Sequence, residues 1–570
     1  MAERRTAGST PLEVAPAEAL LAGTERVWGW GGEGSARPKL SQPARDLLRR
    51  VLDLREPPPA PVPLEWLDMP ESALPERART RLLDAVGEGA LAEDRAARAR
   101  RAAGKSYEDI VRLRSGDARG APDAVVRPGS HEEVAATLAA CADEGVAVVP
   151  FGGGTSVVGG VEALRGGLRA AVTLDVGRLD RLLGLDARSL TATFEAGTVG
   201  RRAEALLAGQ GMTLGHFPQS FEYATLGGYL ATRSAGQAST GFGRFEHLVL
   251  GLRCASPAGE LRVDPVPASA AGPSLRELLV GSEGAFGVIT EATLAVRPTP
   301  AERRYEGWSF PSFEAGAEAL RELAQAGAAP DVARLSDRGE TGLALAQAGA
   351  GGGGTARALR RYLRVRGQRQ PCLAVVGWEG ERGENARRRR LAGRSLRATG
   401  GLALGGGPGR AWARSRFDGP YLRDDLLSLG VLAETLETAT TWSGLAPLHR
   451  AVSGALERAL AERGTPPLVG CHVSHVYRSG ASLYFTVLAR QERGAELEQW
   501  RTAKRAASDA IVATGGTITH HHAVGTAHLP WIEVERGELG VEALRAVKER
   551  LDPAGLMNPG KLLPVPDEGG

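Results

Sequence analysis

Three adjacent histidines, His520, His521 and His522, are the residues of this chain best suited to proton transfer. Imidazole titrates near neutral pH, so a histidine can take a proton from a carbon beside a carbonyl group. Three consecutive side chains do not face the same way on a strand or a helix. The ordinary interpretation is that one is buried, one exposed and one functional. A zinc site is the weaker alternative, because adjacent histidines lack the usual ligand spacing, and we expect no metal.

The run FGGGTSVVGG, from Phe151 to Gly160, has the composition of a phosphate-binding loop. It follows the buried strand pattern VAVVP and holds five glycines in ten residues. Glycine lets the backbone approach an anion closely, and Thr155 and Ser156 add hydroxyl donors. The run matches neither GxxxxGK[ST] nor a GxGxxG that opens a helix, so P-loop and Rossmann sites are excluded. Considered alone, it is explained equally well as a structural turn.

Two further loops of small residues lie downstream of the first. The segment from His216 to Gly243 reads HFPQSFEYATLGGYLATRSAGQASTGFG, and GSEGAFGVITEATL begins at Gly281. The segment from His216 to Gly243 contains more glycines, small hydroxyl residues and aromatics than a turn between two strands needs. Three such loops alternating with strand patterns could enclose a large dinucleotide from several sides. We therefore expect His216–Gly243 to wrap around a ligand.

Local patterns predict the elements that position the first loop. Ser130 followed by Glu133 is a capping box, and Gly145 closes the amphipathic helix that it begins. The strand VAVVP follows directly and leads into the loop at Phe151. In such a β-α-β-loop unit the loop can present its backbone N–H groups to phosphate.

The first hundred residues look like a mostly helical appendage. Helical periodicity covers 42–53 and 75–103, on either side of the Pro-rich run EPPPAPVPLEW. Before them, VWGWGGEG places Trp28 and Trp30 where they could plug a neighbouring domain, although two aromatics that simply cover its surface are the ordinary explanation. Residues 1–24 are small, polar and Pro-containing, and are expected to be disordered.

Composition narrows the classes of function. The chain has 70 Lys and Arg against 67 Asp and Glu, a net charge of +3. This charge balance gives no indication of nucleic-acid binding. The four cysteines form no CxxC pair, which indicates neither a disulfide framework nor a zinc site and favours a reducing, cytosolic setting. There is neither a signal-peptide pattern nor an apolar run of about 18 residues, so we expect no membrane-spanning helix.

Five runs together resemble the flavin-binding domain of the vanillyl-alcohol oxidase family of FAD enzymes: PDAVVRP, FGGGTS, TLGGYLATRSAG, GSEGAFGVITEATL and LDPAGLMNPGKLL. Within that family, HFPQSFEYATLGG, ARLSD, LRDDLLSLGVLAETLETATTW, GASLYFTVLAR and THHHAVG are similar to the alkyldihydroxyacetonephosphate synthases of ether-lipid synthesis. The resemblance covers about residues 100 to 565. It implies an α+β fold, in which a two-subdomain PCMH-type FAD-binding domain is joined to an α+β cap domain.

With this resemblance, composition divides the chain into five parts. They are a disordered tail at 1–24, a helical N-terminal region at 25–116, the FAD-binding domain at 117–300, the cap domain for the substrate at 301–495, and a C-terminal segment at 496–570 that carries the histidines back to the FAD domain. Inside the cap domain, the Gly-rich and basic stretch 349–366 is expected to be a mobile loop. Its basic run is ordinarily a solvated helix face, with a membrane or substrate contact as the alternative.

The resemblance implies that FAD is bound by residues of the three loops. They are Pro150, Phe151, Gly152, Gly153, Gly154, Thr155, Ser156, Pro218, Ser220, Thr225, Gly227, Gly228, Thr232, Ser234, Gly236, Glu283, Gly284, Gly287, Val288 and Ile289. Family members with covalent flavin commonly attach it through a His or Cys near the first loop. FGGGTSVVGG contains neither, so we expect FAD to be non-covalent.

The same resemblance implies roles for residues outside the loops. Tyr484 matches the tyrosine that assists departure of the fatty acid, and the three histidines match the active-site histidine run. The implied substrate-binding residues are Arg334, Arg423, Thr435 and His216. These types suit the chemistry, because a phosphorylated ketone needs cations and a departing carboxylate needs a proton donor. Taken singly, a buried tyrosine or an ion-paired arginine is ordinarily structural.

Three departures from related patterns matter. Thr435 stands where the animal synthases have serine, which keeps the hydroxyl, and ARLSD differs from their RLMD. Flavin-linked 2-hydroxy-acid dehydrogenases typically have a Glu where this chain has His521, together with an upstream GDGNxH-like segment. CHVSHVYRSGASLYF lacks that segment. The absence of that Glu and of the upstream segment disfavours a metal-dependent hydroxy-acid dehydrogenase.

The leading hypothesis is an FAD enzyme that exchanges the acyl chain of acyl-dihydroxyacetone phosphate for a fatty alcohol, with the substrate carbon bonded transiently to flavin N5. The alternative is an FAD-linked oxidase or dehydrogenase of a 2-hydroxy acid or another alcohol, and a flavoprotein that only binds is a third class. The resemblance implies lipid-type substrates and a homodimer. We expect a cytoplasmic protein with peripheral membrane contact, because long-chain substrates require approach to a bilayer.

Overall fold

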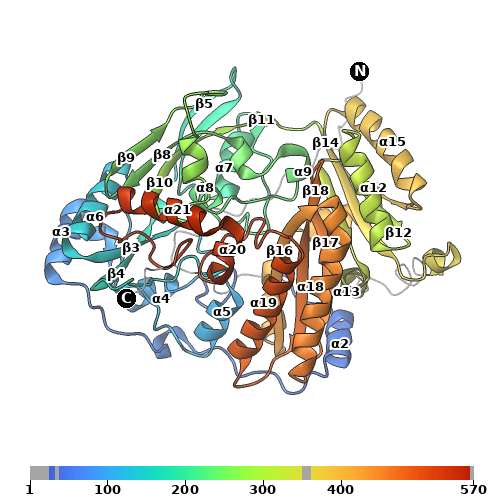
Figure 1. The fold of residues 1–570 in the computed structure, drawn as a ribbon, viewed down its shortest axis with the longest axis horizontal. Helices are drawn as coiled ribbons and strands as arrows, with labels where there is room; N and C mark the ends of the chain where they lie inside the picture. Colours follow the sequence, from blue (N-terminus) through green and yellow to red (C-terminus); the bar gives the residue numbers. More distant parts are fainter. Residues whose placement is uncertain (1–24, 33–36, 349–357, 359–360, 565–570) are drawn as a thin grey trace, which may run out of the picture.

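The computed structural model describes residues 25–32, 37–348, 358 and 361–564 (Figure 1). The tail expected to be disordered at 1–24, and most of the loop expected at 349–366, lie outside the described residues. The described chain mixes helices and strands in two lobes, as the α+β expectation requires. Within it, no helix combines the length and apolar character needed to cross a membrane.

A four-stranded sheet forms the base of the first lobe. Its strands, in the order β1-β2-β4-β3, are Leu91–Ala92, Ala124–Val126, Ala170–Asp175 and Val146–Phe151. The pairs β2·β4 and β3·β4 are parallel, and most of these residues are buried, as in a sheet covered on both faces. Helices α3 (Glu76–Val86) and α6 (His131–Glu144) pack over it.

Helix α6 begins and ends where the sequence predicts. The Ser130 hydroxyl accepts the N–H of Glu133 at 3.1 Å, and Gly145 closes the helix in the left-handed region at a φ of 64°. The second hydrogen bond of the expected capping box would join the Glu133 carboxylate to the N–H of Ser130. In the structure Glu133 Oε2 instead accepts the N–H of the preceding residue, Gly129, at 2.7 Å. Strand β3 then leads directly into the first glycine loop.

A five-stranded antiparallel sheet completes the first lobe. Its strands, in the order β5-β6-β10-β8-β9, are Leu182–Asp186, Thr191–Glu195, Val288–Ala295, Val249–Ser256 and Gly259–Val263. A buried core around Phe194, Phe245 and Phe286 joins it to its helices. These helices include α7 (Gly200–Ala208), α8 (Leu226–Ala231), α10 (Phe245–Leu248) and α21 (Glu538–Leu551).

A seven-stranded antiparallel sheet is the centre of the second lobe. Its strands, in the order β15-β12-β14-β13-β17-β18-β16, are Leu402–Gly405, Glu302–Phe310, Cys372–Gly380, Val332–Ser336, Leu468–Val476, Gly480–Arg490 and Val431–Thr441. One face packs against α12 (Phe313–Gln325), α15 (Arg382–Ala398), α18 (Trp442–Glu462) and α19 (Glu496–Ala513). On the other face, alternate residues such as Arg334, Thr435 and Tyr484 line a cavity.

The remaining α-helices and strands lie outside the three large sheets and the helices named above. They are α2 (Gln42–Val51), α4 (Arg95–Arg100), α5 (Tyr107–Arg114), α9 (Ser239–Phe242), α11 (Leu275–Leu279), α13 (Arg338–Ala348), α16 (Gly406–Ser415), α17 (Gly419–Leu427), α20 (Ile532–Arg536), β7 (Met212–Thr213) and β11 (Arg297–Pro298).

The N-terminal helices differ from the sequence prediction in one respect. The periodicity over 75–103 is divided between α3 and α4, because a 3-10 helix, η2 (Glu88–Ala90), and then strand β1 lie between them. That strand pairs with β2, so Leu91 and Ala92 contribute to the first sheet instead of a helix. Tertiary pairing overrides the local helical pattern here.

The C-terminal segment returns to the first lobe after leaving the second. Its tail adds a bridge to strand β3, where the N–H of Val148 donates to the oxygen of Leu556 at 2.8 Å. The N–H of Asn558 donates back to the oxygen of Val148, also at 2.8 Å. The histidine run lies on this return path and is therefore held between the two lobes (Figure 1).

Candidate active site

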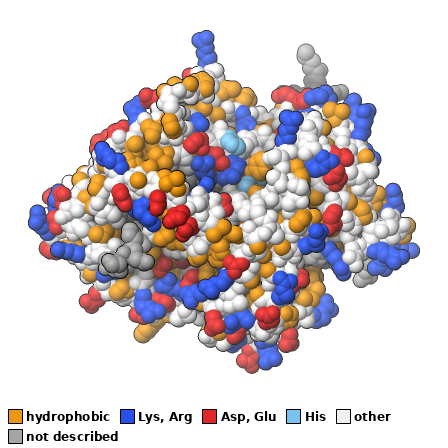
Figure 2. All heavy atoms as spheres, viewed as in Figure 1, with side chains coloured by type: hydrophobic (Ala, Val, Ile, Leu, Met, Phe, Trp, Pro, Cys, Tyr) orange, Lys and Arg blue, Asp and Glu red, His pale blue; other side chains and the backbone are white. Residues whose placement is uncertain are grey.

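A cavity of about 1040 Å³ lies between the glycine loops of the first lobe and the inner face of the seven-stranded sheet. Figure 2 shows the face of the molecule on which the two lobes meet, with histidine side chains visible near the junction. All twenty residues expected to bind cofactor line this cavity, as do Arg334, Arg423, Thr435, Tyr484, His521 and His522. Of the residues expected at the site, His216 and His520 do not line it.

The first glycine loop is shaped by close approach of another backbone. A Cβ atom on Gly153 would lie 2.0 Å from the carbonyl oxygen of Tyr223, and one on Gly152 would lie 2.3 Å from the Thr225 hydroxyl. Gly154 has a φ of 62°, which side chains rarely adopt. The glycines therefore allow this loop to nest against the segment 223–225, and both line the same wall of the cavity.

The third loop is tied to the C-terminal segment. Glu283 adopts a φ of 52°, and its carboxylate accepts the N–H groups of Val524 at 2.8 Å and Gly525 at 2.7 Å. Burial raises the pKa of Glu283 to about 7, against the effect of these two bonds. The contact joins the loop to the chain that follows the histidine run, so this wall of the cavity and the histidines are positioned together.

His216 was expected to line the substrate pocket, and the structure places it behind the wall instead. Its ring packs against Tyr229 and Phe245, with centroids 4.9 Å away in both cases, and its Nε2 lies 3.0 Å from the Ser234 hydroxyl. Burial lowers its pKa to about 3, so the imidazole is neutral. Its contact with the site is therefore indirect, through Ser234, which does line the cavity.

The carboxylate of Glu437, on β16, holds the histidine run in place. Glu437 Oε1 accepts the backbone N–H groups of His520 at 2.9 Å, His521 at 2.7 Å and His522 at 2.8 Å, and the Thr519 hydroxyl at 2.7 Å. Glu437 Oε2 lies 3.2 Å from His521 Nδ1. Burial would raise the pKa of Glu437, but the three imidazoles outweigh it and hold that pKa well below its usual value.

The three histidines differ in surroundings, as their consecutive positions require. His521 and His522 line the cavity, whereas His520 is buried behind it. His520 Nδ1 lies 3.0 Å from His521 Nδ1, and His520 Nε2 lies 2.6 Å from the Tyr477 hydroxyl. Burial lowers the pKa of His522 to about 3, and burial together with His475 lowers the pKa of His520 well below its usual value.

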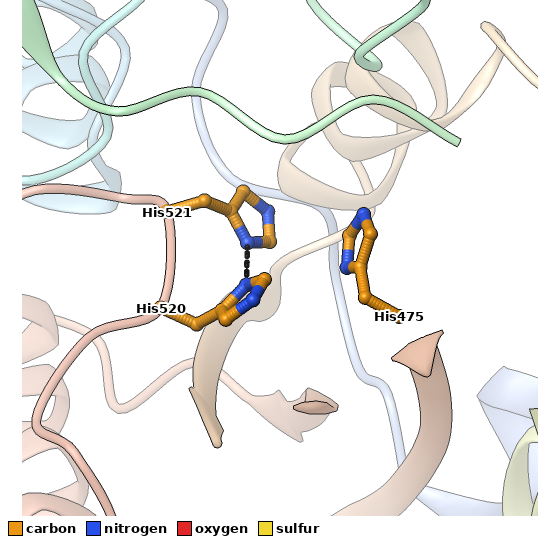
Figure 3. Close-up of side chains that lie close together, drawn as sticks. All are labelled: His475, His520 and His521. Atoms are coloured by element: carbon orange, nitrogen blue, oxygen red, sulfur yellow. Dashed lines mark hydrogen bonds between the residues drawn. The ribbon is translucent and has the colours of Figure 1, made fainter. Parts of the chain in front are cut away.

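His475 joins this cluster from strand β17 (Figure 3). Ring nitrogens of His475, His520 and His521 lie within 4.8 Å of one another, a geometry that could hold a metal ion. These nitrogens already have protein partners, however. His475 Nε2 lies 3.0 Å from the oxygen of Gly236, and its Nδ1 lies 3.2 Å from the Ser482 hydroxyl. The cluster is thus a hydrogen-bonded histidine network within the described chain.

Tyr484, on β18, is presented to the cavity beside the histidines. Its ring stacks on His472 with centroids 4.9 Å apart and lies 5.6 Å from the ring centroid of His522. Burial raises its pKa to about 12, although a hydrogen bond with Thr435 lowers it slightly. Tyr484 therefore remains protonated near neutral pH and can donate a hydrogen bond to a substrate oxygen.

Arg334 approaches the cavity from β13, next to Tyr484. Its guanidinium donates to the Glu340 carboxylate and lies 3.2 Å, at Nη2, from His472 Nδ1. Burial would raise the pKa of Glu340, but Arg334 and His472 hold it at about 2. Arg334 is thus fixed by a partly buried ion pair, and its side chain keeps 26% exposure while lining the cavity.

Arg423, on α17, occupies a different wall. It donates to the backbone oxygen of Lys105, whose own N–H donates to the oxygen of Ser156 in the first glycine loop at 2.6 Å. Its Nε and Nη2 are buried and have no hydrogen-bond partner among the described residues. The neighbouring Asp424 accepts the N–H of Trp30 at 2.7 Å, so the VWGWG segment is anchored here and Trp30 itself lines the cavity.

One arm of the cavity is apolar. It is lined by Leu40, Ala44, Leu48, Leu343, Leu426 and Leu488. Helix α2 covers this arm and is fastened by Arg45, whose Nη2 donates to both carboxylate oxygens of Asp425, at 2.8 and 2.6 Å. This apolar lining suits a hydrocarbon chain and offers little to a charged one.

The cavity also fits FAD. Its three loops supply glycines where the backbone must approach closely, hydroxyls at Thr155 and Ser156, and two unpartnered nitrogens on Arg423 that suit a diphosphate. The remaining space adjoins Tyr484 and the histidines. The residues that sequence reasoning missed are Glu437, His475, Tyr477, Glu340 and His472. For Glu437, His472 and His475 the signal was a charged or polar side chain inside an otherwise apolar strand pattern such as VLAETLETATT. Glu340 on α13 and Tyr477 after β17 carried no such signal.

Comparisons with known proteins identify the family of the chain. The FAD binding domain family matches residues 122–264, and the FAD linked oxidases, C-terminal domain family matches residues 299–562. The alkyldihydroxyacetonephosphate synthase of Trypanosoma brucei brucei is 37% identical over 81% of this chain and 76% of its own length. That of Dictyostelium discoideum is 34% identical over 83% and 79%. A solved alkyldihydroxyacetonephosphate synthase structure superposes with a TM-score of 0.84 at 28% identity, covering 95% of this chain and 99% of the other. The chain therefore belongs to the alkyldihydroxyacetonephosphate synthase family of FAD-binding proteins.

Proposed function

We propose that this protein exchanges the acyl chain of acyl-dihydroxyacetone phosphate for a fatty alcohol and so forms the ether bond of an ether lipid. The observation that carries the proposal is the arrangement of one cavity. It joins the FAD loops to Tyr484 and to the histidines, and it extends into the apolar arm under α2. A flavin cofactor, a proton donor, a base and a chain-binding surface therefore meet in a single space.

The substrate headgroup is assigned to the charged part of the cavity. Arg334, fixed by Glu340, provides a cation beside Tyr484. The unpartnered nitrogens of Arg423 provide hydrogen-bond donors on another wall of the cavity. Arginine binds phosphate through paired N–H donors, so these side chains suit either the substrate phosphate or the FAD diphosphate. Because Arg423 is tied to the first glycine loop through Lys105, we assign it to the cofactor side and Arg334 to the substrate side.

Each reacting group has a residue that serves it. The neutral Tyr484 donates a proton or hydrogen bond to the carboxylate that departs with the acyl chain. His521 is oriented by Glu437 through its Nδ1, which leaves Nε2 on the far side of the ring to take a proton from the carbon next to the carbonyl. FAD held by the three loops would supply a nucleophilic flavin nitrogen to this chemistry. The overall reaction involves no net oxidation.

The two chains are assigned to the same apolar arm. The departing fatty acid and the incoming alcohol are both long hydrocarbons, and the leucines under α2 provide their contact surface. Because the arm ends beneath α2, we further propose that this helix faces the bilayer from which the chains come, in a cytoplasmic protein with peripheral contact. Co-sedimentation with vesicles of neutral and anionic lipid tests this contact, and a homodimer is tested by light scattering.

One assay tests the function against its alternative. Purified protein is incubated with labelled hexadecanol and palmitoyl-dihydroxyacetone phosphate, and in parallel the flavin absorbance is followed during addition of a panel of 2-hydroxy acids. Labelled ether without flavin bleaching is the expected result. Rapid bleaching by a 2-hydroxy acid with no ether product would show an FAD-linked oxidase or dehydrogenase instead.

The attachment of FAD is tested separately. The first glycine loop contains no His or Cys, so we propose that FAD is held without a covalent bond. Acid precipitation should therefore leave the yellow colour in the supernatant. Colour that stays with the precipitated protein would contradict the proposal.

A further inference from the structure

Three side chains form a continuous line from the cavity to the far side of its wall. His521 lines the cavity, His520 lies buried behind it, and Tyr477 follows at the end of β17, where it is partly exposed. We propose that His521, His520 and Tyr477 are a proton relay that exchanges the hydrogen of the substrate carbon with solvent. This inference rests on the proposed function, and assigns Tyr477 and His520 as residues that act through His521.

The two hydrogen bonds of the line reach His520 at opposite sides of its ring. His521 Nδ1 lies 3.0 Å from His520 Nδ1, and His520 Nε2 lies 2.6 Å from the Tyr477 hydroxyl (Figure 3 shows the first of these). A proton that enters one nitrogen of an imidazole can thus be matched by one that leaves the other. No rearrangement of a side chain is needed for the transfer.

The proton balance closes along this line. In the resting state His521 Nδ1–H donates to His520 Nδ1, His520 Nε2–H donates to the Tyr477 oxygen, and His521 Nε2 is free to act as base. When the substrate C–H bond breaks, its electron pair stays on the substrate and is delocalised toward the neighbouring carbonyl oxygen. The proton moves to His521 Nε2, one proton advances at each link, and the Tyr477 O–H proton passes to water. The reverse sequence returns a solvent hydrogen to the carbon and resets every tautomer.

Burial of His520 disfavours a proton that stays on its ring, so the transfers along the line must occur together. The Glu437 carboxylate, 3.2 Å from His521 Nδ1, holds the His521 ring beside the line. Arg244 contacts the Tyr477 hydroxyl and pairs with Glu246 at 2.8 Å, so the outer end of the line is polar. His475 stands beside the line, but its Nε2 is engaged by the oxygen of Gly236.

The test follows the isotope in the product. Wild-type protein and Tyr477→Phe are each given palmitoyl-dihydroxyacetone phosphate and hexadecanol in D2O, and the ether product is analysed by mass spectrometry. Wild type should place deuterium on the reacting carbon. In Tyr477→Phe the abstracted proton has no exit and returns to the carbon, so the deuterium content per product should fall at least about fivefold. A general loss of folding or of FAD would lower the amount of product without changing its isotope content.

Two controls complete the experiment. Tyr305→Phe removes a hydroxyl that lies 2.6 Å from the Glu379 Oε1 elsewhere in the same sheet, and should leave the deuterium content unchanged. Product incubated in D2O without enzyme measures spontaneous exchange. If Tyr477→Phe yields no product, rates of the wild type in H2O–D2O mixtures decide, because several protons in motion give a curved dependence and one proton gives a straight line.

Each result has a clear meaning. Deuterium in the Tyr477→Phe product at the wild-type level, or a straight-line dependence in the mixtures, would overturn the relay. Ether product from wild type without deuterium would also overturn it, while leaving the proposed function intact. The absence of any ether product from the FAD-loaded wild type would count against the proposed function itself.

Discussion

Glu437 and His521 are linked at two points, one in the backbone and one in the side chain. Glu437 Oε1 accepts the His521 N–H at 2.7 Å, and Glu437 Oε2 lies 3.2 Å from His521 Nδ1. The carboxylate is buried, so it fixes both the position and the tautomer of this imidazole. A strand residue of the second lobe therefore positions the histidine that we propose as the base of the reaction.

Glu437→Gln should separate this role from ordinary packing. The amide has nearly the same size, but it cannot carry the negative charge, and its NH2 group would face other donors. We expect kcat for ether formation to fall about 100-fold with little change in KM, and unfolding free energy to fall by about 1–3 kcal/mol. Glu379→Gln, a buried carboxylate outside the cavity lining, is the matched control and should lose stability only. An unchanged kcat in Glu437→Gln would remove Glu437 from the mechanism.

Tyr484→Phe tests the proton donor for the departing carboxylate. Because the Tyr484 hydroxyl is protonated and lies in the cavity, its removal should lower kcat for acyl exchange about 100- to 1000-fold, while FAD content and the flavin spectrum stay normal. Thr435→Val, which removes the hydroxyl partner of Tyr484, should have a smaller effect, and Thr435→Ser should retain activity. Full exchange activity in Tyr484→Phe would contradict the assignment.

The cofactor wall could be predicted from the sequence because its signal is local. Glycine and hydroxyl residues at Phe151–Ser156 and Thr225–Gly236 follow strand patterns directly, and the loops are brought together by the sheets that those patterns form. Alternation along β18 likewise turns Tyr484 to the inner face while Phe485 enters the core. These features depend on residues near each other in the chain.

The support of the histidine run could not be predicted in this way. Glu437 is opposite Tyr484 in the β16·β18 register and reaches the histidines only because the C-terminal segment crosses the sheet end. His475 comes to the cluster from β17, through the register of a third strand. His216 was misplaced for the same reason, since whether a loop side chain points into a cavity or behind its wall depends on what packs against it, here Tyr229 and Phe245.

Gly153→Ala should weaken FAD binding without disturbing the rest of the protein. A Cβ at this position would lie 2.0 Å from the Tyr223 carbonyl oxygen, so the loop must move away from the segment that it nests against. We expect FAD affinity, measured by fluorescence titration of the apoprotein, to fall at least about tenfold. Gly184→Ala, where a Cβ meets no atom within 4 Å, is the control and should bind FAD normally. Equal FAD affinities for the two variants would show that FAD binding by the first glycine loop does not depend on Gly153.

Ala44→Leu should shorten the apolar arm. Ala44 lies on α2, is 3% exposed, and lines the cavity together with Leu48. Adding three carbons there takes space from the end of a bound chain, so the preference for long alcohols should shift to shorter ones. We expect kcat/KM to fall about tenfold for octadecanol and to change little for dodecanol. Arg49→Ala, exposed on the same helix, should show the wild-type profile. If kcat/KM fell by the same factor for every alcohol length, the alkyl chain of the alcohol would not bind in this arm.

Glu340 should make stability depend on pH in a predictable direction. Its folded pKa of about 2 lies below its usual value of 4.5, because Arg334 and His472 outweigh the effect of burial. A depressed carboxyl pKa stabilises the fold fully above the unfolded pKa, and this contribution is lost as pH falls from about 5 toward 2. It amounts to roughly 3 kcal/mol. Urea unfolding with saturating FAD should therefore show a wild-type advantage over Glu340→Gln that is constant from pH 7 to 6 and shrinks steadily at lower pH. Glu314→Gln, exposed on α12, should show no such trend, and a wild-type advantage that stayed constant to pH 3 would contradict the ion pair.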